Sequence, residues 1–259
     1  MEELNGKVAL VTGAAQGIGK SYVDHLLKHE VKVMISDVNK TVGEATREEL
    51  ATKHGEKNVK FVKCDVTSET EFEDAIKETI KVFGQLDILI NNAGIAAEKD
   101  SALMININFN SVVNGTYLGM KYMGKDHGKH GGTVVNIASL TTFTPFECAP
   151  VYSATKSAVN QFSRSIGTKF HYDRTGVRVI SINPGLTDTT ILKSCVDNMP
   201  LEFKESFYTN VEKEYIQSVN NMGEGLIEVL KKAESGSLWV IEFDQPARRL
   251  DFIVEKYNN

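Results

Sequence analysis

A glycine-rich turn near the start of the chain, set between an apolar run and a helical pattern, does most to limit the possible folds. Val8–Val11 is wholly apolar, which is typical of a strand buried on both faces of a parallel sheet. Gly13, Gly17 and Gly19 follow in G-x-x-x-G-x-G spacing, and a helical pattern then runs to Lys28. Glycines at such a turn let a pyrophosphate approach the backbone and the N-terminus of the helix. The sequence predicts a phosphate-binding crossover, although the spacing differs from G-x-G-x-x-G and a purely structural turn is the alternative.

Apolar runs and helical patterns then alternate along the rest of the chain. We expect further strands at 31–36, 59–63, 86–90, 133–138, 176–182 and 238–242, with helices ending near 54 and spanning about 68–83, 101–123, 153–172 and 223–232. This alternation predicts one α/β domain over residues 1–259 with a mainly parallel sheet. In such sheets ligands bind at the carboxyl ends of the strands, near the point where the strand order reverses.

Asp37 ends the second expected strand, eighteen residues after Gly19. A carboxylate at this offset can accept both ribose hydroxyls of an adenosine and repels a 2′-phosphate. The next residues, Val38 and Asn39, carry no cation. NAD is therefore favoured over NADP, and the alternative is an aspartate that only caps the next helix.

Tyr152 and Lys156 lie four positions apart, which places them on one face of a helix, about 6 Å apart along its axis. An ammonium near a phenol favours the phenolate, so we expect the tyrosine pKa to fall from about 10 and the phenol to accept protons near neutral pH. Such pairs alone are common on solvated helix faces. Ser139, thirteen residues before the tyrosine, ends an apolar run, and its hydroxyl is suited to hold a substrate oxygen.

The composition excludes several classes of function. The net charge is −5 and no block of Lys or Arg stands out, which argues against nucleic-acid and membrane binding. The three cysteines are widely spaced and lack a C-x-x-C pair, so we expect reduced thiols in a cytoplasmic protein. His25 and His29 have the i,i+4 spacing of a metal site, but no nearby Cys or Glu completes one. We expect no metal, and both histidines exposed on their helix.

Taken together, these motifs resemble the short-chain dehydrogenase/reductase family over essentially the whole chain. The matching pieces are Thr12–Gly19, Asp65, Asn91–Gly94, Asn108, Ser139, Tyr152-x-x-x-Lys156, Pro184–Gly185 and Thr189. The resemblance implies a Rossmann-like, doubly wound fold with a seven-stranded parallel sheet and helices on both faces. It also implies a homodimer paired through the helices around 101–123 and 153–172. The tail, 245–259, is expected to pack on the partner subunit.

The resemblance also assigns roles to individual residues. Tyr152 takes the hydroxyl proton, Ser139 holds the same oxygen, Lys156 tunes the tyrosine and holds a ribose, and Asn108 anchors a proton-carrying water chain. The residues expected at the cofactor are Gly13, Gln16, Gly17, Ile18, Gly19, Asp37, Asp65, Val66, Asn92, Ala93, Gly94, Tyr152, Lys156, Pro184, Gly185, Thr187 and Thr189. Those expected at the substrate are Ser139, Ala149, Tyr152 and Leu192.

A stretch from about 190 to 222 is interpreted as a substrate lid, with an ordinary surface helix pair as the alternative. Its apolar residues, Leu192, Met199, Phe203, Phe207 and Tyr208, predict an apolar pocket. The function expected is NAD-dependent oxidation of a hydrophobic secondary alcohol, prostaglandin-, steroid- or terpenoid-like, or reduction of the matching ketone. Residues 115–119 and 150–152 are most similar to the 15-hydroxyprostaglandin dehydrogenases, and 236–239 to insect-type alcohol dehydrogenases. The chain departs from the prostaglandin enzymes at Cys148–Ala149, where they carry a glutamine that holds the substrate hydroxyl.

A non-catalytic dinucleotide-binding sensor or scaffold on the same fold is the alternative, since a fold alone does not fix a function. The set of Asn108, Ser139, Tyr152 and Lys156 argues against it, because a protein that only binds a dinucleotide has no use for an activated phenol.

Overall fold

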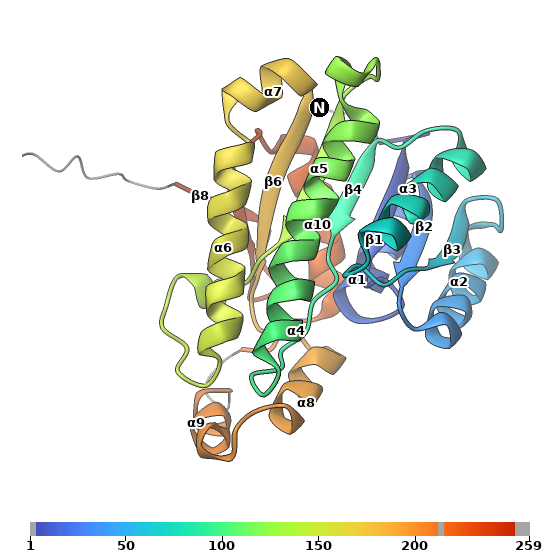
Figure 1. The fold of residues 1–259 in the computed structure, drawn as a ribbon. Coiled ribbons are helices and arrows are strands. Elements are labelled where there is room, and N and C mark those ends of the chain that lie inside the picture. Colours follow the sequence, from blue (N-terminus) through green and yellow to red (C-terminus); the bar gives the residue numbers. More distant parts are fainter. Residues whose placement is uncertain (1–3, 212–214, 252–259) are drawn as a thin grey trace, which may run out of the picture.

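The computed structural model describes residues 4–211 and 215–251, which form a single sheet with helices on both faces (Figure 1). The strands follow the order β3-β2-β1-β4-β5-β6-β7-β8 across the sheet. They are β1 Val8–Thr12, β2 Lys32–Asp37, β3 Val59–Lys63, β4 Ile88–Asn91, β5 Gly132–Ile137, β6 Val177–Pro184, β7 Leu238–Ile241 and β8 Arg248–Leu250. The first seven run parallel and β8 pairs antiparallel with β7.

Helices connect the strands and cover the two faces. They are α1 Gly17–Lys28, α2 Lys40–His54, α3 Glu69–Phe83, α4 Ser101–Ile105, α5 Ser111–Met123, α6 Pro150–Ile166, α7 Lys169–Thr175, α8 Thr190–Asp197, α9 Leu201–Val211 and α10 Val219–Lys232. A π-helical turn, η1 Asn106–Asn110, joins α4 to α5, and the short 3₁₀ turns are η2 Lys125–His127 and η3 Leu140–Thr142. No helix within the described ranges is long and apolar enough to cross a bilayer.

Alternate residues of the central strands feed two separate cores. In β1, Ala9 and Val11 pack into a cluster with α1 and α10, whereas Leu10 packs into a second cluster with α3 and α5. Both faces of the strand are buried, which is why its sequence is apolar throughout rather than alternating. The expected doubly wound α/β fold is confirmed.

Three elements differ from the sequence-based expectations. The helix expected over 101–123 contains the π-helical turn η1, and the one expected over 153–172 divides into α6 and α7 at Gly167. A side chain at Gly167 would collide with the backbone of Gly236, so only glycine fits there. Within the tail, residues 248–250 form an eighth strand on β7, and 252–259 lie outside the described residues.

His25 is not exposed, contrary to expectation. Its side chain is buried and its Nδ1 lies 2.9 Å from the carbonyl oxygen of Ser21. The ring packs against Gly223 of α10, where a side chain would leave it no room. His29 is the C-cap residue of α1. His25 therefore belongs to the packing of α1 on α10, and His29 to the C-terminal end of α1.

Candidate active site

A cavity of about 1030 Å³ opens at the carboxyl ends of the parallel strands, beneath which α8 and α9 lie (Figure 1). Every residue expected to contact cofactor or substrate lines it. Asn108 is the one expected catalytic residue that does not, because it is fully buried behind the cavity wall.

The glycine turn after β1 packs tightly on the segment after β4. Gly13 has a φ of 62°, and a Cβ there would lie 2.7 Å from the Cα of Ala93. The amide nitrogen Nδ2 of Asn92 donates to the carbonyl oxygens of Thr12 and Gly13 at 2.8 and 3.0 Å. The Oγ1 of Thr12 in turn accepts from the backbone N–H groups of Asn92 and Ala93. The ends of the two strands are thereby locked together, in part by a threonine that was not assigned to the site.

Helix α1 begins at this turn without a side-chain cap. Its N-cap residue, Gln16, makes no side-chain cap bond, and the first turn contains no acidic residue. Helix starts leave N–H groups without helical partners, and these groups attract anions. The cavity therefore presents a cradle that fits the pyrophosphate of a dinucleotide.

Asp37 lies at the end of β2 and does not cap α2, whose N-cap residue is Asn39. Its Oδ2 accepts from the N–H of Ala15 at 3.0 Å and its Oδ1 from the N–H of Asn39 at 2.9 Å. The carboxylate thus fixes the glycine turn and still lines the cavity. Val38 beside it is 60% exposed and supplies no cation.

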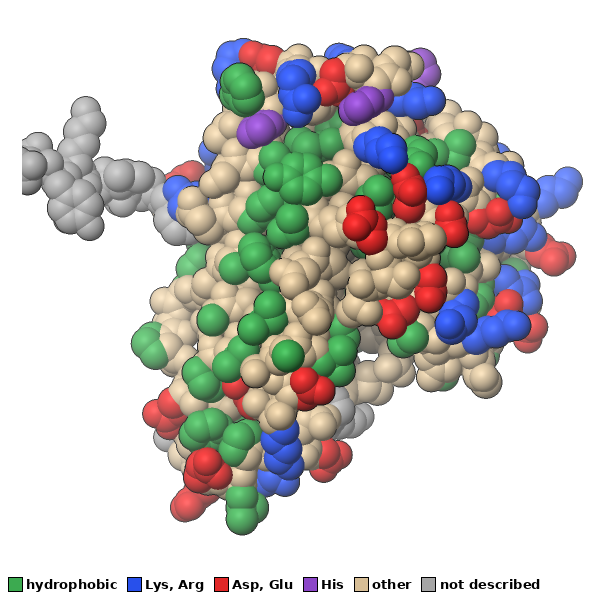
Figure 2. Space-filling model, viewed as in Figure 1, with side chains coloured by type: hydrophobic (Ala, Val, Ile, Leu, Met, Phe, Trp, Pro, Cys, Tyr) green, Lys and Arg blue, Asp and Glu red, His purple; other side chains and the backbone are tan. Residues whose placement is uncertain are grey.

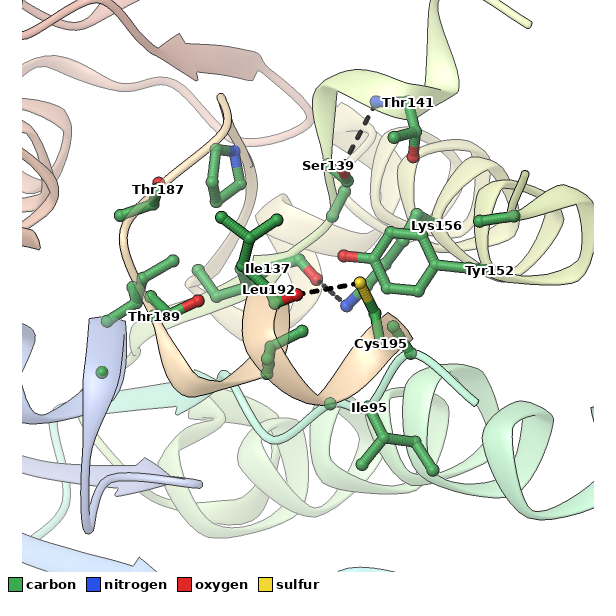
Figure 3. A pocket seen from close by; sticks show the side chains of 18 of the residues that line it. Ile95, Ile137, Ser139, Thr141, Tyr152, Lys156, Thr187, Thr189, Leu192 and Cys195 are labelled. Carbon is green, nitrogen blue, oxygen red and sulfur yellow. Dashed lines mark hydrogen bonds between the residues drawn. The ribbon is translucent and has the colours of Figure 1, made fainter. Parts of the chain in front are cut away.

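Tyr152 and Lys156 project from α6 toward the end of β5. The Nζ of Lys156 donates to the carbonyl oxygen of Ile137 at 2.9 Å and lies 5.7 Å from the centre of the Tyr152 ring. The phenol oxygen points into the cavity, with Ser139 on one side and Leu192 and Cys195 of α8 on the other (Figure 3). The Oγ of Ser139 accepts from the N–H of Thr141 at 3.3 Å, which fixes its position.

Burial dominates the electrostatics of this pair. Desolvation raises the pKa of Tyr152, and the hydrogen bond with Ser139 acts against that rise. Desolvation also lowers the pKa of Lys156 to about 8, since the ammonium is only 4% exposed. The expected fall of the tyrosine pKa is therefore wrong for this structure, because the loss of water outweighs the hydrogen bond with Ser139. The lysine becomes the first of the two groups to lose a proton as pH rises.

Asn108 sits in the π-helical turn and is held from two sides. Its Nδ2 donates to the carbonyl oxygen of Ile95 at 2.8 Å and its Oδ1 accepts from the N–H of the same residue at 2.9 Å. Only Gly94 separates it from the lysine, since a Cβ there would lie 3.3 Å from both Asn108 Oδ1 and Lys156 Nζ. π-helical turns often occur at functional sites. The water chain expected at Asn108 stays a prediction.

A family model described as short chain dehydrogenase matches residues 7–200. The chain belongs to the short-chain dehydrogenase/reductase family. Among curated relatives, 15-hydroxyprostaglandin dehydrogenase [NAD(+)] of Mus musculus is 38% identical over 232 residues, which cover 88% of this chain and 86% of the relative. Alcohol dehydrogenase 2 of Ceratitis capitata is 32% identical over 182 residues and 70% of each chain.

A solved structure of a family member supports the fold independently. The short chain dehydrogenase/reductase from Burkholderia phymatum, in complex with NAD, superposes with a TM-score of 0.78 at 20% identity and covers 89% of this chain and 88% of its own. The resemblance inferred from the motifs, to this family and to its prostaglandin and insect alcohol dehydrogenases, is confirmed.

In this family member the end of the cavity beyond Tyr152 is apolar. Cys148, Cys195, Met199 and Phe207 form a buried cluster there, against which Leu192, Phe146 and Phe203 pack. Tyr208 was expected to join them but is 53% exposed. The interpretation of residues 190–222 as a substrate lid stays a prediction.

Sequence reasoning missed several residues that line the cavity. They are Ile95, Glu98, Thr141, Phe143, Phe146, Cys195 and Arg248. Cys195 follows Leu192 at helical spacing, which is a signal that could have identified it. Glu98 carries no such local signal.

Proposed function

We propose that this chain is an NAD-dependent dehydrogenase that oxidises a hydrophobic secondary alcohol, or reduces the matching ketone. One observation carries the proposal: the hydroxyls of Tyr152 and Ser139 and the buried Lys156 meet between a phosphate-binding turn and an apolar pocket. The names of the mouse and Ceratitis relatives, an NAD(+) enzyme and an alcohol dehydrogenase, support both cofactor and reaction class.

The cavity fits NAD on its glycine side. The start of α1 would hold the pyrophosphate, Asp37 the adenosine ribose, and Asp65 and Val66 the adenine side. Asn92–Gly94, Lys156 and residues 184–189 would hold the nicotinamide half. Bound NAD supplies the hydride acceptor.

Side chains of the protein accept the proton of the alcohol and hold its oxygen. Tyr152 accepts the hydroxyl proton, and Ser139 donates a hydrogen bond to the same oxygen. The phenol is itself protonated near neutral pH, so it can accept that proton only as its own passes on. We propose that the uncharged amine of Lys156, whose Nζ lies 5.7 Å from the ring centre, takes it up, so the pair acts as one base. General-base catalysis of this kind contributes about 10²–10⁴ in rate.

The apolar cluster around Phe207 favours a substrate with a hydrocarbon body, as in prostaglandins, steroids or terpenoids. Ala149 lines the pocket with a methyl group. At position 149 the chain therefore offers the substrate an apolar contact rather than a side-chain hydrogen bond.

A panel of such alcohols, mixed with the protein and NAD, tests the proposal through the appearance of NADH absorbance. We expect turnover with apolar secondary alcohols and little with ethanol. If NADH binds but no alcohol in the panel is oxidised, the non-catalytic sensor or scaffold becomes the better explanation.

A further inference from the structure

Helix α6 carries both Tyr152 and Lys156, yet it begins without a cap of its own. The N-cap residue is Ala149, whose side chain makes no hydrogen bond, and the next residue, Pro150, has no N–H. The N–H of Ser153 bonds to the carbonyl oxygen of Ala149 at 3.0 Å. The N–H groups of Val151 and Tyr152 are left without partners inside the helix.

Glu98 takes both of these N–H groups from a distant part of the chain. Its Oε1 accepts from the N–H of Tyr152 at 2.8 Å and its Oε2 from the N–H of Val151 at 3.2 Å. The carboxylate also lies at the positive end of the helix dipole, where a negative charge is stabilising. One of its two bonds is thus made to the backbone of the residue proposed to accept the proton.

The segment that carries Glu98 contacts two other parts of the site. Four residues earlier, Gly94 lines the cavity beside Lys156. One residue later, Lys99 donates from its Nζ to the carbonyl oxygen of Asp197 at 2.9 Å and from its N–H to that of Asn198 at 3.2 Å, at the end of α8. The start of α6 is therefore held by the same segment that contacts the lid.

We propose that Glu98 is a positioning residue for Tyr152. The proposal rests on the function proposed above, in which the phenol accepts the substrate proton. Tyr152 is the third residue of α6, so its hydroxyl stays opposite Ser139 only while the first helical turn is held in place. Without the carboxylate, the N–H groups of Val151 and Tyr152 lose their acceptor, and the first turn of α6 frays.

The test compares Glu98→Ala with Glu98→Gln, using the alcohol that the wild type oxidises best. We expect Glu98→Ala to lower kcat about 10-fold or more, because misplacement of a reacting group by about 1 Å is that costly, while the Kd for NADH changes less than about 2-fold. Glu98→Gln keeps a carbonyl oxygen for the N–H of Tyr152 and should recover most of kcat.

Ser68→Ala serves as the matched control, because Ser68 caps α3 through the N–H of Glu71 and does not line the cavity. It should lower the Tm by a comparable amount and leave kcat unchanged. If Glu98→Ala keeps wild-type kcat, or loses only as much as Ser68→Ala does, the proposal is overturned.

Amide hydrogen exchange at Val151 and Tyr152 provides a readout that does not depend on turnover. We expect faster exchange at both amides in Glu98→Ala, whereas Glu98→Gln should keep protection close to wild type at Tyr152, whose N–H still has an acceptor. Unchanged exchange in Glu98→Ala would refute the positioning role whatever the kinetics. Absence of turnover in the wild type would instead refute the proposed function, and exchange would still decide whether Glu98 holds the tyrosine.

Discussion

At the scale of one residue, burying the ammonium group of Lys156 lowers the stability of the folded protein but places the group beside the proposed base, Tyr152. Its pKa of about 8 in the folded protein means that keeping the ammonium charged at neutral pH costs about 3 kcal/mol relative to water. The hydrogen bond to the carbonyl oxygen of Ile137 offsets part of that cost. A methionine would fill the same space without the charge.

We therefore expect Lys156→Met to abolish turnover without a large loss of stability. Because the folded pKa lies below the unfolded value, the unfolded chain binds more protons between about pH 8 and pH 10.5, and the wild-type free energy of unfolding gains a contribution that rises over that window. The variant should lack this rise. Urea unfolding of both proteins at several pH values measures the difference, and parallel curves would contradict the assignment.

The rate of alcohol oxidation should rise with pH through an apparent pKa near 8. Lys156 loses its proton with a pKa of about 8, whereas that of Tyr152 is raised by burial, so the pair first gains the ability to accept a proton in this range. Cys195, which faces the phenol, has a pKa of about 11 and does not account for the limb. Ketone reduction should fall over the same range. A profile of kcat/KM that rises only near pH 10 would exclude this explanation.

Tyr152→Phe should lower kcat by about 10²–10⁴ while NADH binds almost as in the wild type. The ring still packs and only the ionisable oxygen is removed. Tyr22→Phe is the matched control, since the Tyr22 hydroxyl is buried with no hydrogen-bond partner among the described residues and lies away from the cavity. Retention of more than about a tenth of wild-type activity in Tyr152→Phe would contradict its role as the base.

At the scale of elements, the turn between β2 and α2 sets the choice of cofactor. Asp37→Ala with Val38→Arg should shift preference toward NADP, because a repelling carboxylate is replaced by an exposed cation. Asp37→Asn with the same Val38→Arg change removes the charge but keeps one acceptor oxygen for the N–H of Ala15 or of Asn39, so it loses less of the turn than Asp37→Ala does. Ratios of kcat/KM for the two cofactors report the shift. Equal wild-type rates with NAD and NADP would refute the prediction.

The sequence was most informative about elements whose formation depends mainly on residues close together in the chain. Strands β1, β2 and β4 to β7 are mostly buried, so apolar runs and glycine turns identified them. Strand β3 is only partly buried and carries two lysines, and it was identified from its place in the alternation of strands and helices. β8 was missed because its three residues include two arginines and its position depends on pairing with β7. The cap at Glu98 was missed because its partners lie 53 and 54 residues away.

The tyrosine pKa shows the limit at a single site. The spacing of Tyr152 and Lys156 correctly predicted that the two side chains lie near each other. The direction in which the tyrosine pKa shifts depends on burial, which is a property of the assembled cavity. The boundary of α6 failed for a similar reason, since Gly167 ends the helix through contact with Gly236.

At the scale of the whole molecule, we propose that two copies pair through the face made by α4, α5, α6 and α7. Exposed apolar side chains gather there, including Leu103, Ile105, Tyr117, Phe170 and Tyr172, and Figure 2 shows a strip of hydrophobic side chains along this face. Light scattering should give a mass near twice 28.6 kDa.

Tyr117→Asp should convert the dimer to a monomer, because it places a charge on the apolar face of α5, where the Tyr117 ring packs against Phe162 of α6. Tyr208→Asp is the control, since Tyr208 is equally exposed but belongs to α9. A wild-type protein that scatters as a monomer at micromolar concentration would refute the pairing.

The two edge strands of the sheet affect how readily the protein aggregates at high concentration. At one margin β3 carries Lys60 and Lys63, and at the other β8 is three residues long and carries Arg248 and Arg249. Short strands and cationic side chains at a margin discourage a strand of another molecule from adding to it. Without β8, the apolar strand Leu238–Ile241 would offer its free N–H and C=O groups to any such strand. By pairing with β7, the short strand β8 therefore opposes the amyloid-like addition of strands from other molecules.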